Sequence, residues 1–157
     1  MAKSAIDRLR SPQEPKIVKD MPPRVAHWAP PGGSMVIATP LEVDELIRQI
    51  PKGKVATINT LRDALASRHG TDIACPVTTG IFANIVMQAA AEEEMMGSKK
   101  VAPWWRVIKS DGKLNEKAPG GLAEHERRLA AEGWAFEQAG KKGRKLAGYD
   151  NRLATLR

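Results

Sequence analysis

The stretch Thr39-Pro-Leu-Glu-Val-Asp-Glu-Leu-Ile-Arg-Gln-Ile-Pro-Lys-Gly53 decides the fold, because regular structural signals begin there. Glu42 follows Thr39 by three residues and Pro40 stands at the first helical position, a capping box with the favoured proline. Apolar residues then recur at helical spacing until Pro51 and Gly53 interrupt the pattern. We expect a helix between Thr39 and Ile50.

A second helical pattern follows a short extended piece at residues 54–56. Either Thr57 or Asn59 is suited to cap it, since both side chains can accept a hydrogen bond from a backbone amide of the first turn. The pattern stops near His69 and Gly70.

The third pattern is the longest. Pro76 can open a helix that Thr78 or Thr79 caps, and its apolar residues continue at helical spacing to the three glutamates at 92–94. The apolar positions are Ile81, Phe82, Ile85, Val86 and Ala89. Residues 76–91 contain no Lys or Arg, and for contacts with DNA they offer Thr78, Thr79, Asn84, Gln88 and the free backbone amides at the helix start. The amides and hydroxyls at that start could hold a phosphate. The alternative is an ordinary helix start, with the glutamates on a solvated face.

Shorter elements complete the chain. We expect a strand at 105–108, a turn at 110–112, a helix at 122–132, and a hairpin that pairs 134–138 with 144–149. Two helices, a longer helix and a small β-element follow one another in the order of a winged helix-turn-helix. The predicted fold class is therefore mainly α with a small β wing.

Charge and composition divide the chain into three parts. Residues 1–38 are rich in proline and read as an extended basic N-terminal arm, residues 39–138 as the winged-helix domain, and residues 139–157 as a basic C-terminal hairpin or tail. The formal net charge is +7, and the last part carries six Lys or Arg against one Asp. Basic flanks attract polyanions such as nucleic acid, or they simply keep a protein dissolved.

Several classes of protein are excluded by composition. A single cysteine, Cys75, allows no internal disulfide, and three scattered histidines favour neither a metal site nor a cofactor. No apolar run is long enough to span a membrane, and the N-terminus does not resemble a signal peptide. We expect a cytoplasmic protein. Cys75 itself is either a reactive thiol at a helix start or a small buried side chain.

Five short strings match a known family in the same order: Ile50–Gly53, Val101–Ile108, Ser110–Leu114, Gly120-Gly121 and Leu129–Gly133. Together they resemble the DNA-binding domain of the methylated-DNA–protein cysteine methyltransferases and of their non-catalytic relatives, the alkyltransferase-like proteins. The resemblance covers residues 40–135.

The resemblance implies that the reactive site is lost. The methyltransferase motif Pro-Cys-His-Arg is Pro103-Trp104-Trp105-Arg106 here, so Trp104 takes the place of the nucleophile and Trp105 that of its base. An indole can neither attack an alkyl group nor accept a proton near neutral pH. We therefore expect no enzyme. Trp104 is either a wall for a flipped base or a core residue, and Glu132, the relay glutamate of the family, is expected on the helix surface.

Two further family positions differ. Ile58 stands where the relatives have a tyrosine that presses on a phosphate, and Val77 stands where an arginine fills the gap left by a flipped base. Val77 could act instead as an apolar wedge between base steps. Arg106 and Lys109 are candidates for contacts with the DNA backbone.

The resemblance implies a non-catalytic DNA-binding protein, associated with the nucleoid, that recognises O6-alkylguanine or other damaged bases. Its partners would be double-stranded DNA and a repair protein. The alternative is a diverged winged-helix module that binds protein and has lost lesion recognition. The candidate DNA-binding residues are Trp104, Trp105, Arg106, Thr78, Thr79, Val77, Ile58 and Lys109.

Overall fold

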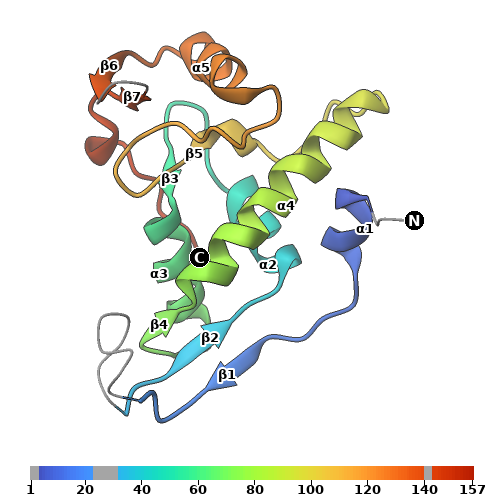
Figure 1. Ribbon diagram of the computed structural model, residues 1–157, viewed down its shortest axis with the longest axis vertical. Coiled ribbons are helices and arrows are strands. Elements are labelled where there is room, and N and C mark those ends of the chain that lie inside the picture. The colour runs from blue at the N-terminus through green and yellow to red at the C-terminus, as the bar shows by residue number, and fades with distance from the viewer. Residues whose placement is uncertain (1–3, 23–31, 140–142) are drawn as a thin grey trace.

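The computed structural model describes residues 4–22, 32–139 and 143–157, and it combines helices with small sheets (Figure 1). The helices are α1 (Ala5–Arg10), α2 (Pro40–Arg48), α3 (Ile58–His69), α4 (Pro76–Met95) and α5 (Gly121–Ala131). The strands are β1 (Lys16–Val18), β2 (Met35–Ile37), β3 (Ala56–Thr57), β4 (Ile73–Ala74), β5 (Val107–Ile108), β6 (Phe136–Ala139) and β7 (Gly143–Leu146). Short 3-10 helices cover Trp104–Arg106 (η2) and Tyr149–Asn151 (η3). Helix α4 crosses the molecule, with α5 and the β6–β7 hairpin beyond one side and the β1–β2–β4 sheet beyond the other.

The first two predicted helices are confirmed. The Thr39 hydroxyl accepts a hydrogen bond from the Glu42 amide at 3.2 Å, and the Glu42 carboxylate accepts one from the Thr39 amide at 3.1 Å. Thr57, rather than Asn59, caps α3, and Gly70 ends it with a left-handed φ of 67°. These reciprocal bonds satisfy amides that a helix start leaves free.

Helix α4 opens at Pro76 as expected, but neither Thr78 nor Thr79 caps it. The capping position belongs to Cys75, whose amide donates to Val36 O at 2.9 Å, so the helix leaves the sheet directly. Thr79 lies one turn inside and its hydroxyl donates back to Cys75 O at 2.7 Å. The helix packs against α1, α2 and α3. A helix with neighbours on several sides needs apolar residues on most of its surface, which explains its composition.

The predicted extended arm is wrong for residues 5–10, which form α1 and pack on α4. The Glu92 carboxylate accepts hydrogen bonds from the amides of Ala5 and Ile6 at 2.9 and 3.1 Å. These amides need acceptors because a helix start leaves them free. Glu92 therefore does not belong to a solvated face. Strand β1 pairs antiparallel with β2, and β2 pairs parallel with β4.

The predicted strand at 105–108 is shorter, since only Val107–Ile108 pair, parallel with β3. The preceding residues form η2 instead. The β6–β7 hairpin is confirmed, with Phe136 opposite Leu146, although residues 140–142 of its predicted turn lie outside the described residues. The chain then returns to the domain, where the Ala154 amide donates to Val55 O at 2.8 Å.

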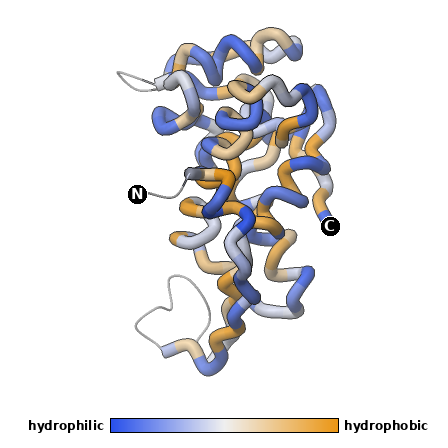
Figure 2. Tube along the Cα trace, turned by 90° about the vertical axis from the view of Figure 1, so that its right-hand side faces the viewer, coloured by the Kyte–Doolittle hydropathy of each residue, from blue (hydrophilic) through white to orange (hydrophobic). Residues whose placement is uncertain are grey.

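Among the described residues, two larger clusters of buried side chains and a small one around Met35 hold these elements together. The first joins α2, α3 and α4, with Leu46, Leu61 and Met87 almost fully buried. The second joins α5 to the hairpin through Ile108, Leu129 and other apolar residues. Each fully buried side chain of this kind contributes about 1.5–3 kcal/mol. Hydrophobic stretches accordingly gather in the middle of the molecule (Figure 2). None of the described helices is long and apolar enough to cross a membrane.

Candidate nucleic-acid interface

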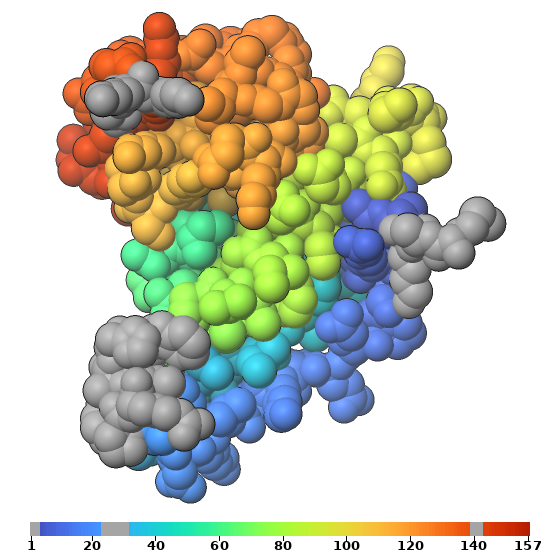
Figure 3. Space-filling view, viewed as in Figure 1, coloured from blue at the N-terminus to red at the C-terminus, as the bar shows by residue number. Residues whose placement is uncertain are grey.

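Three segments enclose an open pocket of about 400 Å³. Ile58 comes from the start of α3, Val77 and Ile81 from the first turns of α4, and Lys109 from the loop that follows β5. These segments meet on the face drawn in Figure 3. Three predicted residues that are distant in the sequence, Ile58, Val77 and Lys109, thus line one pocket.

The α3 and α4 sides of this pocket are mostly apolar, and the loop after β5 gives it a polar side. Val77 and Ile81 are 54% and 52% exposed, although both belong to a helix that is otherwise well packed. Ile81, one of the apolar positions at helical spacing, therefore lines the pocket and is not part of the buried core.

One edge of the pocket is a loop that is tied to α4. The Gln88 side chain donates to Lys117 O at 3.1 Å, and the Asn115 amide group contacts Met87 Sδ at 3.8 Å. Lys109 Nζ lies 2.6 Å from Glu116 Oε2. The hydrogen bond from Lys109 lowers the pKa of Glu116 below its ordinary value. The loop thus carries a lysine whose charge is locally compensated.

His125 holds this loop from inside. Its Nδ1 accepts a hydrogen bond from the backbone amide of Asn115 at 3.2 Å. Its Nε2 lies 2.9 Å from Trp105 O and donates to that oxygen when the ring is neutral. Burial lowers the pKa of His125 to about 4, although the bond to Trp105 O opposes this. A neutral imidazole therefore links the pocket loop to η2. Sequence reasoning missed this residue, although its helical spacing to Leu122 and Leu129 was visible.

Trp104 is fully buried and does not line the pocket. It packs edge-on against Trp105, with ring centroids 5.9 Å apart, and the Arg128 guanidinium lies 5.0 Å from the centre of its ring. Of the two alternatives for Trp104, the core residue therefore agrees with the structure and the wall of a base pocket does not. Because residues 104–106 form a 3-10 helix, the Trp104 side chain packs into the core next to α4. A strand would have placed Trp104 and Trp105 on opposite faces.

Trp105, Arg106 and Glu132 form a polar cluster beside that core. The Glu132 carboxylate accepts hydrogen bonds from Trp105 Nε1 at 2.9 Å and from Arg106 Nη2 at 2.7 Å. Burial alone would raise the pKa of Glu132, but the hydrogen bonds from Arg106 and Trp105 lower it overall. Arg106 also donates to Ile50 O at 2.7 Å. Glu132 is thus an anchor for η2 rather than a surface residue, and Arg106 is engaged within the fold rather than directed to a phosphate.

The remaining candidates are dispersed. Thr79 is buried and Thr78 is half-buried, and neither lines the pocket. Cys75 is buried against Met21 and Met35, as a small apolar side chain would be. Glu94 pairs with Arg128 at 3.0 Å, so two of the three glutamates at 92–94 have partners within the fold. Within the described part of the chain, no three His, Cys, Asp or Glu side chains gather as a metal site would require.

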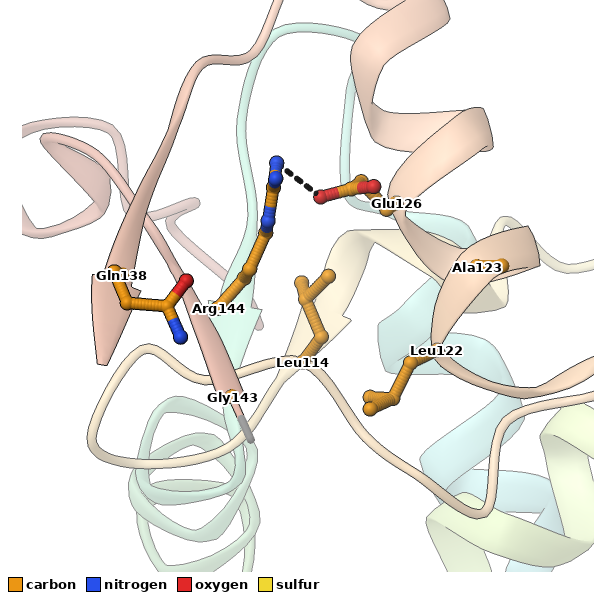
Figure 4. Close-up of a pocket in the computed structure, with 7 residues that line it drawn as sticks. All are labelled: Leu114, Leu122, Ala123, Glu126, Gln138, Gly143 and Arg144. Carbon is orange, nitrogen blue, oxygen red and sulfur yellow. Dashed lines mark ion pairs between the residues drawn. The ribbon is translucent and has the colours of Figure 1, made fainter. Parts of the chain in front are cut away.

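A separate pocket of about 250 Å³ lies between α5 and the β6–β7 hairpin (Figure 4). Leu114, Leu122 and Ala123 give it an apolar side, and Arg144 Nη1 lies 2.7 Å from Glu126 Oε1 on another. It shares no lining residue with the first pocket.

Comparisons with known proteins place these features in context. The model of the family described as 6-O-methylguanine DNA methyltransferase, DNA binding domain, matches residues 39–134. Two solved structures have a similar fold: S. pombe Atl1 in complex with damaged DNA containing O6-carboxymethylguanine, at 22% identity, and S. pombe ATL in complex with DNA, at 21% identity. Each has a TM-score of 0.51, and each comparison covers 73% of this chain and 93% of that chain. Among curated proteins none matches.

Proposed function

The chain belongs to the family of 6-O-methylguanine DNA methyltransferase DNA-binding domains, and we propose that it is a non-catalytic, alkyltransferase-like protein that binds damaged double-stranded DNA. The observation that carries this proposal is the pocket shared by Ile58, Val77 and Lys109. Family membership relates Ile58 and Val77 to the positions that handle a flipped nucleotide in DNA-binding relatives, and Lys109 adds a positive charge at the edge.

The chemistry supports binding without reaction. Trp104 replaces the alkyl-accepting cysteine and has no nucleophilic atom. The sole thiol, Cys75, is buried in a cluster with Met21 and Met35 and does not line the pocket. A base that entered the pocket would therefore be held and released unchanged.

The pocket has properties that an extruded base requires. A flipped base loses its stacking partners, so it needs apolar or aromatic surface in exchange. Ile58, Val77 and Ile81 supply apolar surface, and the volume of about 400 Å³ falls within the range of roughly 300–1,000 Å³ for ligand pockets.

We also infer a winged helix-turn-helix arrangement in residues 39–138, completed by β7 from the C-terminal part at 139–157. In this arrangement α3 and α4 form the helix pair, α4 points its first turn at the DNA, and the loop after β5 with the β6–β7 hairpin forms the wing. Lys109 and Lys117 at the pocket edge would then contact phosphates, as would the free amides at the start of α4. The flanks, 1–38 and 139–157, would add mainly electrostatic attraction.

The test is an equilibrium titration of a fluorescent duplex containing one O6-methylguanine and of its unmodified twin, across a range of salt concentrations. We expect tighter binding to the modified duplex and a log–log salt slope near −0.9 per phosphate contacted. Equal and weak binding to both duplexes would contradict the proposal.

A protein-binding module is the second candidate, and the pocket between α5 and the hairpin favours it. That pocket combines an apolar side with an ion pair and shares no residue with the first. Absence of binding to either duplex, together with an intact fold, would favour this candidate. A repair protein that binds here would be compatible with both.

A further inference from the structure

Among the polar side chains of the first pocket, Asn84 differs from its neighbours. Its Oδ1 is buried and has no hydrogen-bond partner within the described residues. Three of its polar neighbours are engaged, since Lys109 pairs with Glu116 and Asn115 Oδ1 accepts a hydrogen bond from the Lys117 backbone amide at 2.9 Å. Asn84 is thus a pocket residue with unused hydrogen-bonding capacity.

The orientation of its amide decides which atom a ligand can meet. Because Oδ1 is covered, the polar atom that Asn84 can present to the pocket is Nδ2, which only donates. A reversed amide would bury two N–H groups without a partner among the described residues in place of a single oxygen. Burying unpaired donors is costly, so the donor stays on the pocket side.

A fixed donor distinguishes alkylated from normal guanine. In guanine the ring N1 carries a hydrogen, which makes it a donor. Alkylation of O6 fixes the ring in the form whose N1 has a lone pair instead, which makes it an acceptor. A site that presents only a hydrogen-bond donor to ring N1 can bond to alkylated guanine, whose N1 accepts. With unmodified guanine the same site would place two donors against each other.

We propose that Asn84 is a specificity-determining residue, whose Nδ2 donates to ring N1 of an O6-alkylated guanine and thereby disfavours unmodified guanine. This inference rests on the proposed function, because it requires a base in the pocket. The hydrogen bond at ring N1 would then distinguish the two bases, and the alkyl group would contact the apolar side chains of Val77 and Ile81.

Three duplexes that differ at one position test it: guanine, O6-methylguanine and 2-aminopurine, which has the N1 lone pair but no alkyl group. The wild type should bind the second and third about tenfold more tightly than the first, the value of one good hydrogen bond. Asn84→Ala should reduce both preferences below about twofold, and Asn84→Asp, which replaces the donor by an acceptor, should favour guanine. The matched control is Asn59→Asp, which adds the same charge at an exposed position at the start of α3 and should weaken all three complexes equally.

Each of the other outcomes contradicts either the role of Asn84 or the proposed function. If folded Asn84→Ala and Asn84→Asp keep the preferences of the wild type, the role of Asn84 is wrong while the proposed function stands. That role is also wrong if the wild type binds 2-aminopurine no better than guanine but still prefers O6-methylguanine. If the wild type shows no preference for O6-methylguanine, the proposed function fails, and this inference fails with it. Near-ultraviolet circular dichroism checks the fold of each variant, and Asn84→Ala provides the result if Asn84→Asp does not fold.

Discussion

The pocket beside Val77 and the tryptophan cluster around η2 differ in almost every physical property. The pocket is open, and Val77 and Ile81 in its walls are about half exposed. The cluster has a closed core, with Trp104 fully buried and Glu132 bound to both Trp105 and Arg106, although Trp105 and Glu132 also line a separate open pocket of about 420 Å³. The family motif drew attention to the cluster, yet Ile58 and Val77, two positions that differ from the relatives, line the pocket. A motif that has lost its nucleophile can remain as a structural support for the site next to it.

The largest effect that separates the two regions should come from Trp104→Ala. Removing a buried indole from between α4 and Arg128 should lower the free energy of unfolding by about 3–5 kcal/mol. Urea denaturation followed by circular dichroism measures this. A variant that keeps its stability but loses DNA binding would show instead that Trp104 belongs to the pocket.

Acid should weaken the link between the two regions through His125. The folded state keeps this imidazole neutral down to its pKa of about 4, whereas the unfolded chain protonates it near 6.5. The unfolded state therefore binds more protons between these values, so stability falls as pH decreases through that window. The loss should reach about 2 kcal/mol at pH 5. Urea denaturation at pH 7 and pH 5 measures it, and His125→Gln should show a smaller difference between the two pH values.

Glu132→Gln should affect the cluster alone. The variant loses the ion pair with Arg106, which is largely buried, and should lose about 1–3 kcal/mol of stability. DNA affinity at a temperature where the variant is folded should not change, because Glu132 does not line the pocket. Loss of affinity by the folded variant would mean that the cluster contacts DNA directly.

The smallest expected effect concerns the pocket edge. Glu116→Gln frees Lys109 from its ion pair and removes a negative charge, so affinity for any duplex should rise about twofold to fivefold at low salt. The matched control is Asp111→Asn, which removes the same charge from a longer contact with Lys113 at 3.7 Å. Equal changes in both variants would indicate net charge rather than release of Lys109.

Local sequence signals predicted most of the regular structure. The capping residues Thr39 and Thr57 and the prolines Pro40 and Pro76 located the starts of α2, α3 and α4, because these preferences act within a few residues. Helix α1 was missed because its start is satisfied by Glu92, which lies 87 residues from Ala5 in the sequence. The local signal, Ser4 capping α1 by accepting a hydrogen bond from the Asp7 backbone amide, is short and stands just ahead of the proline-rich stretch that begins at Pro12.

The candidate site was predicted unevenly for the same reason. Ile58 and Val77 came from matching positions to a family and Lys109 from its charge, and the fold brings them together. Asn84 was recognised only as a polar position of the long helix, and His125 was missed, because their roles depend on burial and on partners in other segments. The sequence left Trp104 open between a wall and a core residue, because a short apolar run cannot reveal that the backbone of η2 turns its side chain inward.

The most direct test of the central claim compares two matched substitutions. Val77 and Leu41 each follow the proline that opens a helix and are 54% and 44% exposed, but only Val77 lines the pocket. We expect Val77→Asp to weaken binding to an O6-methylguanine duplex at least about tenfold, since a carboxylate would face both the base and the phosphates, while Leu41→Asp changes it less than about twofold. Equal affinities of the two folded variants would contradict the assignment of this pocket as the DNA-recognition site.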